Sequence, residues 1–188
     1  MVPPDSIAGA ETWVNGSLVV ATALLGLEWG CYAWIWHRPD EFRATSGRVL
    51  GRATSDPVSA MLGLFVTFKL LQLTVFTAWC LPDLEIWAFG VGVPGVLLGA
   101  ALVVAGQVLN VSVCLRLGRV GMFYGRRLGY RVPWQRGFPF SLLRHPQYTG
   151  ALMTIWGLFL VFRAPAPDWF ALPLIETAFY TIGARIET

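Results

Sequence analysis

Long apolar runs limit what this sequence can fold into. They cover roughly residues 18–36, 58–81, 86–115, 142–162 and 169–186 and are separated by short polar stretches. A helix needs about 20 apolar residues to cross the hydrocarbon core of a bilayer. Hydrophobic residues make up 55% of the 188 residues, and the net charge is only +3. We therefore expect an all-α integral membrane protein, a bundle of four to five transmembrane helices forming one domain over residues 1–188.

The first apolar run, 18–36, leaves two arrangements open. It is near the minimum length for a spanning helix, and Glu28 interrupts it. Trp29 and Tyr32 are aromatic residues of the kind found at membrane interfaces. The run either crosses the bilayer or lies partly within one leaflet. Residues 1–17 lack Lys and Arg, so we expect no cleavable signal peptide and retention of this segment.

Arginine is distributed very unevenly between the two sides of the predicted bundle. Every arginine except Arg163 falls on the side that holds residues 37–57 and 116–145. Short loops rich in Lys and Arg stay in the cytosol, so this side is predicted to be cytosolic. An acidic N-terminal stretch on the opposite side is consistent with a first segment that crosses.

Residues 118–150 form the longest polar interruption of the chain and favour an anion-handling site. The planar guanidinium group of arginine binds carboxylates and phosphates through two parallel hydrogen bonds. A loop of this length without its own secondary structure usually has a function. The alternative is a loop whose arginines only set the orientation in the membrane. The stretch contains one of the two histidines, His145, and six arginines: Arg119, Arg126, Arg127, Arg131, Arg136 and Arg144.

Two groups of polar residues lie inside the apolar runs. Lys69 and Gln72 are three residues apart and share one helix face. An intramembrane lysine indicates a functional site, but Lys69 could instead pair with Glu28 or Glu176 to hold the bundle together. The sequence leaves both interpretations open.

The third run combines small and polar residues. Gly95 and Gly99 form a small-residue packing face. Gly106 serves either helix packing or, with its neighbours Gln107 and Asn110, a ligand groove. The predicted topology brings residues 106–110, the start of the fourth run and the end of the fifth to similar depth, where a pocket would open to the cytosol and touch lipid headgroups.

Several spaced motifs agree with one another over nearly the whole chain. Lys69-x-x-Gln72 and Glu187 accompany a set concentrated between residues 106 and 150: Gly106-Gln107-x-Leu109-Asn110, Gly121-x-Phe123-Tyr124-Gly125-x-Arg127-x-Gly129, Pro133-Trp134, Phe138-Pro139-Phe140 and His145-Pro146-Gln147-Tyr148-x-Gly150. This set resembles the membrane phospholipid N-methyltransferases, and among them the plant and algal branch that acts on phosphatidyl-N-methylethanolamine.

The resemblance implies S-adenosylmethionine-dependent N-methylation of phosphatidyl-N-methylethanolamine and then of the dimethyl lipid, toward phosphatidylcholine. It also implies an endoplasmic reticulum or mitochondrial membrane, with the active face toward the cytosol. The family's cofactor-binding Gly-x-Gly falls on Val104-Ala105-Gly106, and its Glu-Glu pair falls on Glu187-Thr188. Arg144, His145 and Tyr148 carry over as further cofactor contacts.

Methyl transfer to an amine is an in-line displacement, for which close alignment of the reactants supplies much of the catalysis. The catalytic residues implied are His145, Tyr148 and Glu187. A general base is left open among His145, Glu176 and Glu187. The lipid phosphate needs a cation at headgroup depth, for which the candidates are Arg126, Arg127 and Arg131.

Two other functions are weighed against this one. The isoprenylcysteine carboxyl methyltransferases share Arg144-His145-Pro146-x-Tyr148-x-Gly150, which favours O-methylation as an alternative. A haem- or lipid-binding anchor without catalytic activity could use His37 and His145. No metal site or nucleic-acid partner is expected, because the three cysteines read as small apolar residues and no basic polar domain is present.

Overall fold

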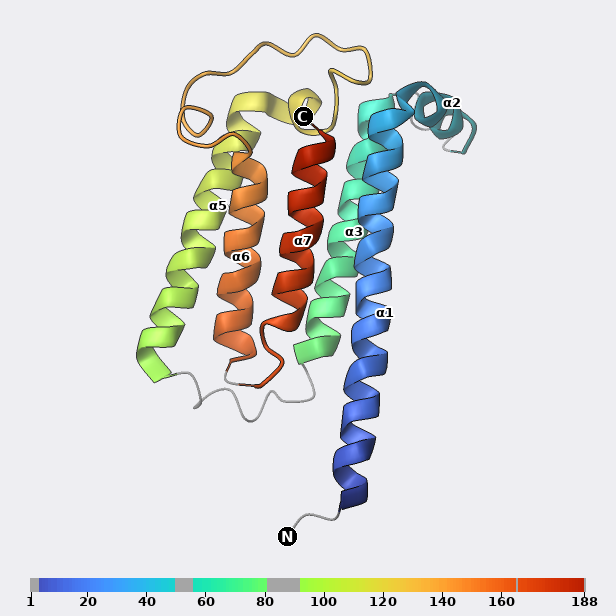
Figure 1. The fold of residues 1–188 in the computed structure, drawn as a ribbon. Coiled ribbons are helices and arrows are strands. Elements are labelled where there is room, and N and C mark those ends of the chain that lie inside the picture. Colours follow the sequence, from blue (N-terminus) through green and yellow to red (C-terminus); the bar gives the residue numbers. More distant parts are fainter. Residues whose placement is uncertain (1–3, 50–55, 81–91, 165, 188) are drawn as a thin grey trace.

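The computed structural model describes residues 4–49, 56–80, 92–164 and 166–187, and all regular structure in these ranges is helical (Figure 1). The all-α prediction is confirmed. The helices, in chain order, are α1 (Pro4–His37), α2 (Pro39–Val49), α3 (Pro57–Cys80), α5 (Gly92–Met122), α6 (Pro146–Phe162) and α7 (Ala171–Ile186).

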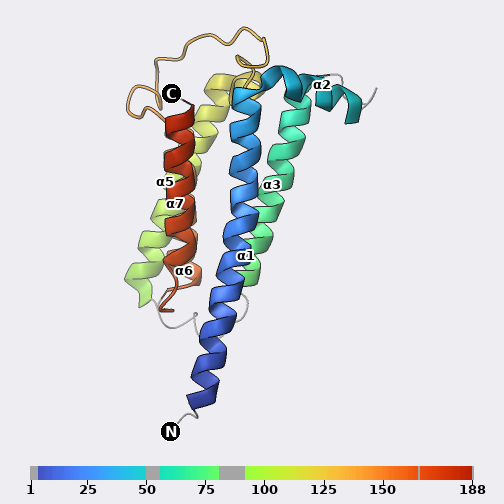
Figure 2. The ribbon, with the colours of Figure 1, turned by 45° about the vertical axis from the view of Figure 1, so that its right-hand side comes forward.

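Five of these helices run side by side as a bundle, and α2 lies across one end of it (Figures 1 and 2). α5 packs on α6, α6 on α7, α7 on α1, and α1 on α3. The end that carries α2 also holds the turns after α5 and the end of α7, whereas the N-terminus lies at the opposite end. The arginine-rich stretches therefore gather at one end of the bundle, as the loop charges predict.

Three helices are long and apolar enough to cross a membrane: Gly16–His37 within α1, Pro57–Cys80 and Gly92–Met122. The first apolar run is thus one of the helices whose length and composition suit a span. α6 and α7 have 17 and 16 residues. At about 1.5 Å per residue they reach roughly 25 Å, short of a hydrocarbon core of about 30 Å. Length and composition therefore support three spans in the described part of the chain, against the four to five predicted.

Two helices extend beyond the apolar runs that predicted them. α1 begins at Pro4 rather than near residue 18, and α5 continues to Met122 rather than ending near residue 115. Hydropathy marks the stretch that suits lipid, whereas helical hydrogen bonding continues into the polar residues beside it. α5 bends at Gly118, whose positive φ of 61° is a conformation open to glycine.

α6 and α7 begin later than predicted. α6 starts at Pro146 rather than near residue 142, because proline suits the first turn of a helix and disfavours helical backbone in the residue before it. α7 starts at Ala171 rather than 169. The polar stretch 118–150 is consequently helical at its two ends, in α5 and α6, whereas residues 123–145 connect the helices through turns and an irregular segment at 130–136.

α2 was not among the predicted helices, because hydropathy searches for spanning segments and this one is polar. Its helix signals are nevertheless present. Pro39 occupies the first helical position, Asp40 and Glu41 follow in the first turn, and Arg48 lies in the last turn. Phe42 packs into the core beside Ile35 at the end of α1. α2 is therefore a surface helix that Phe42 anchors to the core.

Glycines bring α5 and α6 into close contact. A Cβ on Gly106 would lie 2.5 Å from the carbonyl oxygen of Gly150, and one on Gly99 would lie 2.8 Å from that of Gly157. Both glycine pairs repeat after seven residues, two helical turns, so they form a continuous strip on each helix. The predicted packing role of Gly99 is confirmed, and Gly106 belongs to the same contact.

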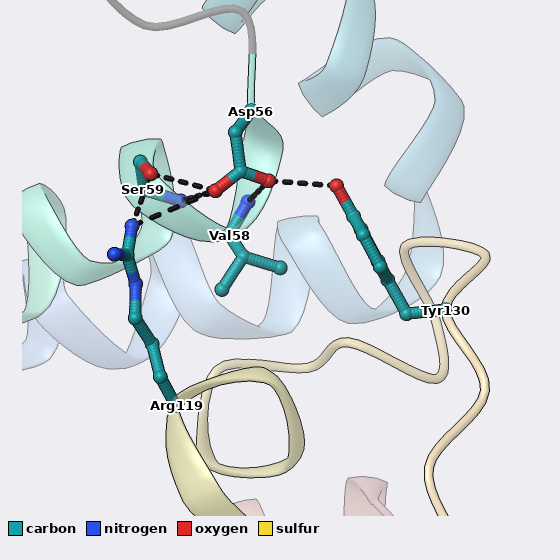
Figure 3. Close-up of polar contacts among 5 residues, drawn as sticks. All are labelled: Asp56, Val58, Ser59, Arg119 and Tyr130. Carbon is teal, nitrogen blue, oxygen red and sulfur yellow. Dashed lines mark hydrogen bonds and ion pairs between the residues drawn. The ribbon is translucent and has the colours of Figure 1, made fainter.

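Asp56 joins three segments at the arginine-rich end of the bundle (Figure 3). It caps α3 by accepting hydrogen bonds from the backbone N–H groups of Val58 and Ser59. The Tyr130 hydroxyl donates to Asp56 Oδ1 over 2.6 Å, and Arg119 Nη2 lies 3.5 Å from Oδ2. Hydrogen bonds from the Ser59 and Tyr130 hydroxyls lower the pKa of Asp56 to about 2. A charged Asp56 therefore ties α5 and the following turns to the start of α3.

Candidate active site

A cavity of about 480 Å³ lies among all five bundle helices and reaches the turn that follows α5. Ligand pockets commonly have volumes of about 300–1,000 Å³ and mostly apolar walls with a few polar groups. Its apolar lower part is formed by residues such as Leu25, Phe76, Phe159 and Leu172. Its polar groups lie at mid-depth and toward the arginine-rich end.

The upper end of the cavity is lined by Tyr124, Tyr148 and Glu187. The Tyr124 hydroxyl donates a hydrogen bond to Glu187 Oε1. Burial raises the pKa of Tyr124, and the neighbouring Tyr148 and Glu187 raise it further, so the hydroxyl stays protonated as a donor. Two residues predicted from the resemblance, Tyr148 and Glu187, are thus brought together here from α6 and from the end of α7.

An aromatic cluster occupies the wall below this upper end. The ring of Trp29 meets those of Tyr180, Tyr148 and Tyr32 at centroid distances of 4.7, 5.9 and 6.2 Å. The rings of Tyr148 and Tyr180 are 5.3 Å apart. All four residues line the cavity, and the rings meet edge to face, a favourable arrangement for aromatic pairs.

A charged network crosses the cavity at mid-depth. Lys69 Nζ lies 3.5 Å from Glu28 Oε1 and donates to Gln72 Oε1 over 2.5 Å. Gln72 in turn donates to Glu176 Oε1 over 3.2 Å. Lys69 therefore pairs with Glu28, one of the two partners that the sequence suggested. The other, Glu176, is connected to Lys69 through Gln72. The same residues line the cavity, so bundle stability and ligand contact are compatible roles.

The cofactor positions predicted on α5 do not face the cavity. Gly106 is packed against α6, and Val104 is 63% exposed on the outside of the helix. Neither they nor Ala105 line the cavity, which α5 reaches instead through Gln107, Asn110 and Met122. The packing interpretation of Gly106 fits the structure, and the ligand groove lies one residue beyond it.

The predicted residues at the start of α6 take different positions. Arg144 is exposed, and His145 is half-buried, with its ring stacked on Tyr148 at a centroid distance of 5.9 Å. Only Tyr148 of the three lines the cavity. His145 therefore contacts the site through Tyr148. Thr188, predicted beside Glu187, lies outside the described residues.

The three arginines predicted to bind a lipid phosphate separate into two environments. Arg126 and Arg131 line a shallow hollow that also contains Tyr130 and Trp134. The guanidinium of Arg127 lies 3.9 Å from the ring centroid of Trp36, a cation–π contact that joins the turn to α1. Arg126 and Arg131 are the members of this set that remain open to an anion at the membrane surface.

The sequence-based prediction missed the contribution of α1 to the site. Trp29 and Tyr32 were interpreted as interfacial aromatics, yet they line the cavity. Leu25 and Glu28 lie on the same face as these two, and the spacing 25, 28, 29 and 32 is that of one helix face, which could have revealed the role. Tyr124 was part of a quoted motif but had no role assigned to it.

The histidines do not form the arrangement required by a haem anchor. His37 is exposed at the end of α1, and neither His37 nor His145 lines the cavity. Within the described ranges, no group of three or more His, Cys, Asp or Glu side chains is placed to hold a metal ion.

Known proteins similar to this chain agree on one family. A sequence model described as phospholipid methyltransferase matches residues 94–188. A curated protein from Arabidopsis thaliana, phosphatidyl-N-methylethanolamine N-methyltransferase, is 31% identical over 128 residues, which cover 66% of this chain and 67% of the relative. No solved structure matches the chain.

Proposed function

Because this chain belongs to the phospholipid methyltransferase family, we propose that it methylates the amine of phosphatidyl-N-methylethanolamine and then of the dimethyl lipid. The methyl donor is S-adenosylmethionine, and the final product is phosphatidylcholine. The observation that carries the proposal is the cavity inside an apolar helix bundle, with Tyr148 and Glu187 at its arginine-rich end. We place the protein in the endoplasmic reticulum membrane with this end facing the cytosol.

The upper part of the cavity fits the polar end of the cofactor. Glu187 offers a carboxylate, an acceptor that the amino group of the cofactor can satisfy. Exposed Arg144 at the start of α6 is a candidate partner for the cofactor carboxylate. When bound, S-adenosylmethionine supplies a methyl group activated by a sulfonium.

The residues of the chain then have distinct tasks. Tyr124 holds the Glu187 carboxylate in place, and His145 stacks on Tyr148 and fixes its ring. The apolar helices exclude water, and the aligned walls hold the reactants close to each other, which is the main source of rate in such a displacement. Among the predicted bases, Glu176 and Glu187 line the cavity and can accept the proton that the amine loses.

We assign the hollow of Arg126 and Arg131 at the membrane surface to the first contact with the lipid phosphate, before the headgroup enters the cavity. Arginine binds phosphate with two parallel hydrogen bonds, and the hollow lies in the turns that connect α5 to α6. This places the phosphate-binding groups on the arginine-rich side, where the headgroups of the cytosolic leaflet would lie.

The test is methyl transfer from radiolabelled S-adenosylmethionine to ethanolamine, monomethyl and dimethyl phospholipids, followed by separation of the lipid products. We expect base-stable label in the products of the last two lipids. The Glu187→Gln variant should lose most of this activity, whereas Glu41→Gln, on the exposed face of α2, should retain it. Label that base releases as methanol would instead establish the carboxyl methyltransferase alternative.

A further inference from the structure

The charged network at mid-depth has acceptor atoms that the protein does not satisfy. Glu28 is 2% exposed and Glu176 is 5% exposed. Among the described residues, no donor meets Oε2 of either at hydrogen-bond geometry, and two buried donors beside the network, Trp29 Nε1 and the Tyr32 hydroxyl, likewise lack an acceptor. A buried carboxylate oxygen without a partner is costly, and the cost is removed by a proton or by a bound cation. Both residues line the cavity, so a ligand held there would lie against these two side chains.

The charges of the network favour a cation. Two carboxyl groups, Glu28 and Glu176, share a single lysine, Lys69, whose closest carboxylate contact is Glu28 at 3.5 Å. Glu176 reaches that lysine only through Gln72. When both glutamates are ionised, one negative charge remains unbalanced in an apolar bundle, and a second cation would neutralise it.

The surrounding rings favour a cation that carries methyl groups. Three aromatic residues line the cavity around the network: Trp29, Tyr32 and Tyr180. The hydroxyl oxygen of Tyr180 lies 3.5 Å from Lys69 Nζ. Aromatic faces attract ammonium ions and are used widely to recognise methylated amines. An unmethylated ammonium has three N–H groups to satisfy in this mostly apolar site, whereas a monomethyl ammonium has two and a dimethyl ammonium one.

We propose that Glu28, Glu176 and the adjoining rings of Trp29 and Tyr180 form the subsite for the ammonium group of the lipid, and that this subsite selects methylated amines over ethanolamine. The proposal rests on the proposed function. The position suits transfer, because Tyr180 joins the network to Tyr148, a predicted cofactor contact, at a ring distance of 5.3 Å. Glu176 precedes Glu187 by eleven residues, about 16 Å along α7, so the two carboxylates serve different parts of the cavity.

The experiment measures binding in detergent of short-chain phospholipids with glycerol, ethanolamine, monomethyl, dimethyl and choline headgroups. For the wild-type protein we expect at least tenfold tighter binding of the dimethyl and choline lipids than of the ethanolamine and glycerol lipids. Glu28→Gln and Glu176→Gln should lose this difference in affinity, which we call the lipid margin. Glu41→Gln, which removes an exposed carboxylate from α2, should keep it.

A parallel arm compares S-adenosylmethionine with S-adenosylhomocysteine, which lacks the sulfonium charge. If the two glutamine variants lose only the preference for S-adenosylmethionine and keep the lipid margin, the network holds the cofactor sulfonium and the proposal is wrong. Unchanged binding of every ligand in both variants would also overturn it, even if the wild-type protein methylates phospholipids.

Two further outcomes separate the inference from the proposed function. If the wild-type protein shows the lipid margin but methylates no phospholipid, the subsite is supported and the proposed function is refuted. If the glutamine variants do not fold, Lys69→Met provides the test. Removing the competing cation should tighten binding of the choline lipid severalfold, and unchanged or weaker binding would contradict the proposal.

Discussion

The Tyr124 hydroxyl donates a hydrogen bond to Glu187 Oε1 and so joins the turn after α5 to the end of α7. The two residues are 63 positions apart in sequence, and both line the upper end of the cavity. Tyr124 adopts a positive φ of 55°, an uncommon backbone conformation for a residue with a side chain. The turn thus directs a tyrosine at the carboxylate assigned to the cofactor.

Tyr124→Phe is therefore expected to weaken cofactor binding. The variant keeps the ring but leaves Glu187 without this donor, and a hydrogen bond to a charged group contributes about 1.5–3 kcal/mol. We predict that the KM for S-adenosylmethionine rises at least tenfold, with a smaller change in kcat. Tyr130→Phe removes a hydroxyl outside the cavity and is the matched control. Equal kinetics of the two variants would contradict the assignment of Glu187.

Docking of the turns onto α3 should depend on the charge of Asp56 (Figure 3). The pKa of Asp56 falls from 3.8 to about 2 in the folded chain. A depressed pKa means that the stabilisation is fully present above about pH 4 and is lost as the pH falls through about 2. The Asp56 side chain is 42% exposed, so solvent screens the interaction and the effect is small.

The measurement is the melting temperature of the wild-type protein and of Tyr130→Phe as a function of pH. At pH 7 the variant should melt about 1–2 °C lower, in line with a partly exposed hydrogen bond in a chain of this size. The difference should vanish as the pH falls from about 4 to about 2. A difference that persists at pH 2 would show that Tyr130 does not act through the Asp56 carboxylate.

Gly106→Ala should destabilise the contact between α5 and α6. The added Cβ would lie 2.5 Å from both the Gly150 carbonyl oxygen and Thr154 Oγ1, so the helices must move apart. Overpacking of this kind costs about 1–3 kcal/mol. Gly63→Ala in α3 is the control, because its Cβ meets nothing within 4 Å and alanine is the better helix former. Thermal unfolding in detergent should therefore separate the two variants, and equal melting temperatures would refute the packing role.

Arg163→Gln should destabilise the end of the bundle opposite α2. Arg163 is 7% exposed, donates to the Trp79 carbonyl oxygen over 2.8 Å and pairs with Asp168 at 2.8 Å. The substitution leaves the Asp168 carboxylate without its cation and the Trp79 carbonyl without this donor. We expect the free energy of unfolding to fall by about 2–4 kcal/mol.

The control for this variant is Arg38→Gln, because Arg38 and Glu41 form an exposed pair worth about 0–1 kcal/mol. Chemical denaturation of both variants in the same detergent compares the two losses directly. A loss from Arg163→Gln no greater than that from Arg38→Gln would show that the buried pair does not hold α3 to the α6–α7 turn.

The family and the helical membrane character could be predicted from the sequence, because both depend on local signals. Each motif, such as His145-Pro146-Gln147-Tyr148, is a short continuous stretch of the chain. The apolar runs likewise indicate which segments can lie in lipid. Tyr148 and Glu187 were also predicted, and both line the cavity. By contrast, the position carried over onto Val104 points outward, since a motif fixes a helix but a shift of one residue rotates it by about 100°.

The amino-acid sequence by itself thus determined the five helices of the bundle, the family and the arginine-rich side of the membrane, but not α2. Only the tertiary structure decided which faces of those helices meet. It placed Glu28 of α1, Lys69 of α3 and Glu176 of α7 around one cavity, and it closed α5 onto α6 through glycines. The physical reason is that burial and charge balance depend on neighbours distant in sequence, which helix packing selects.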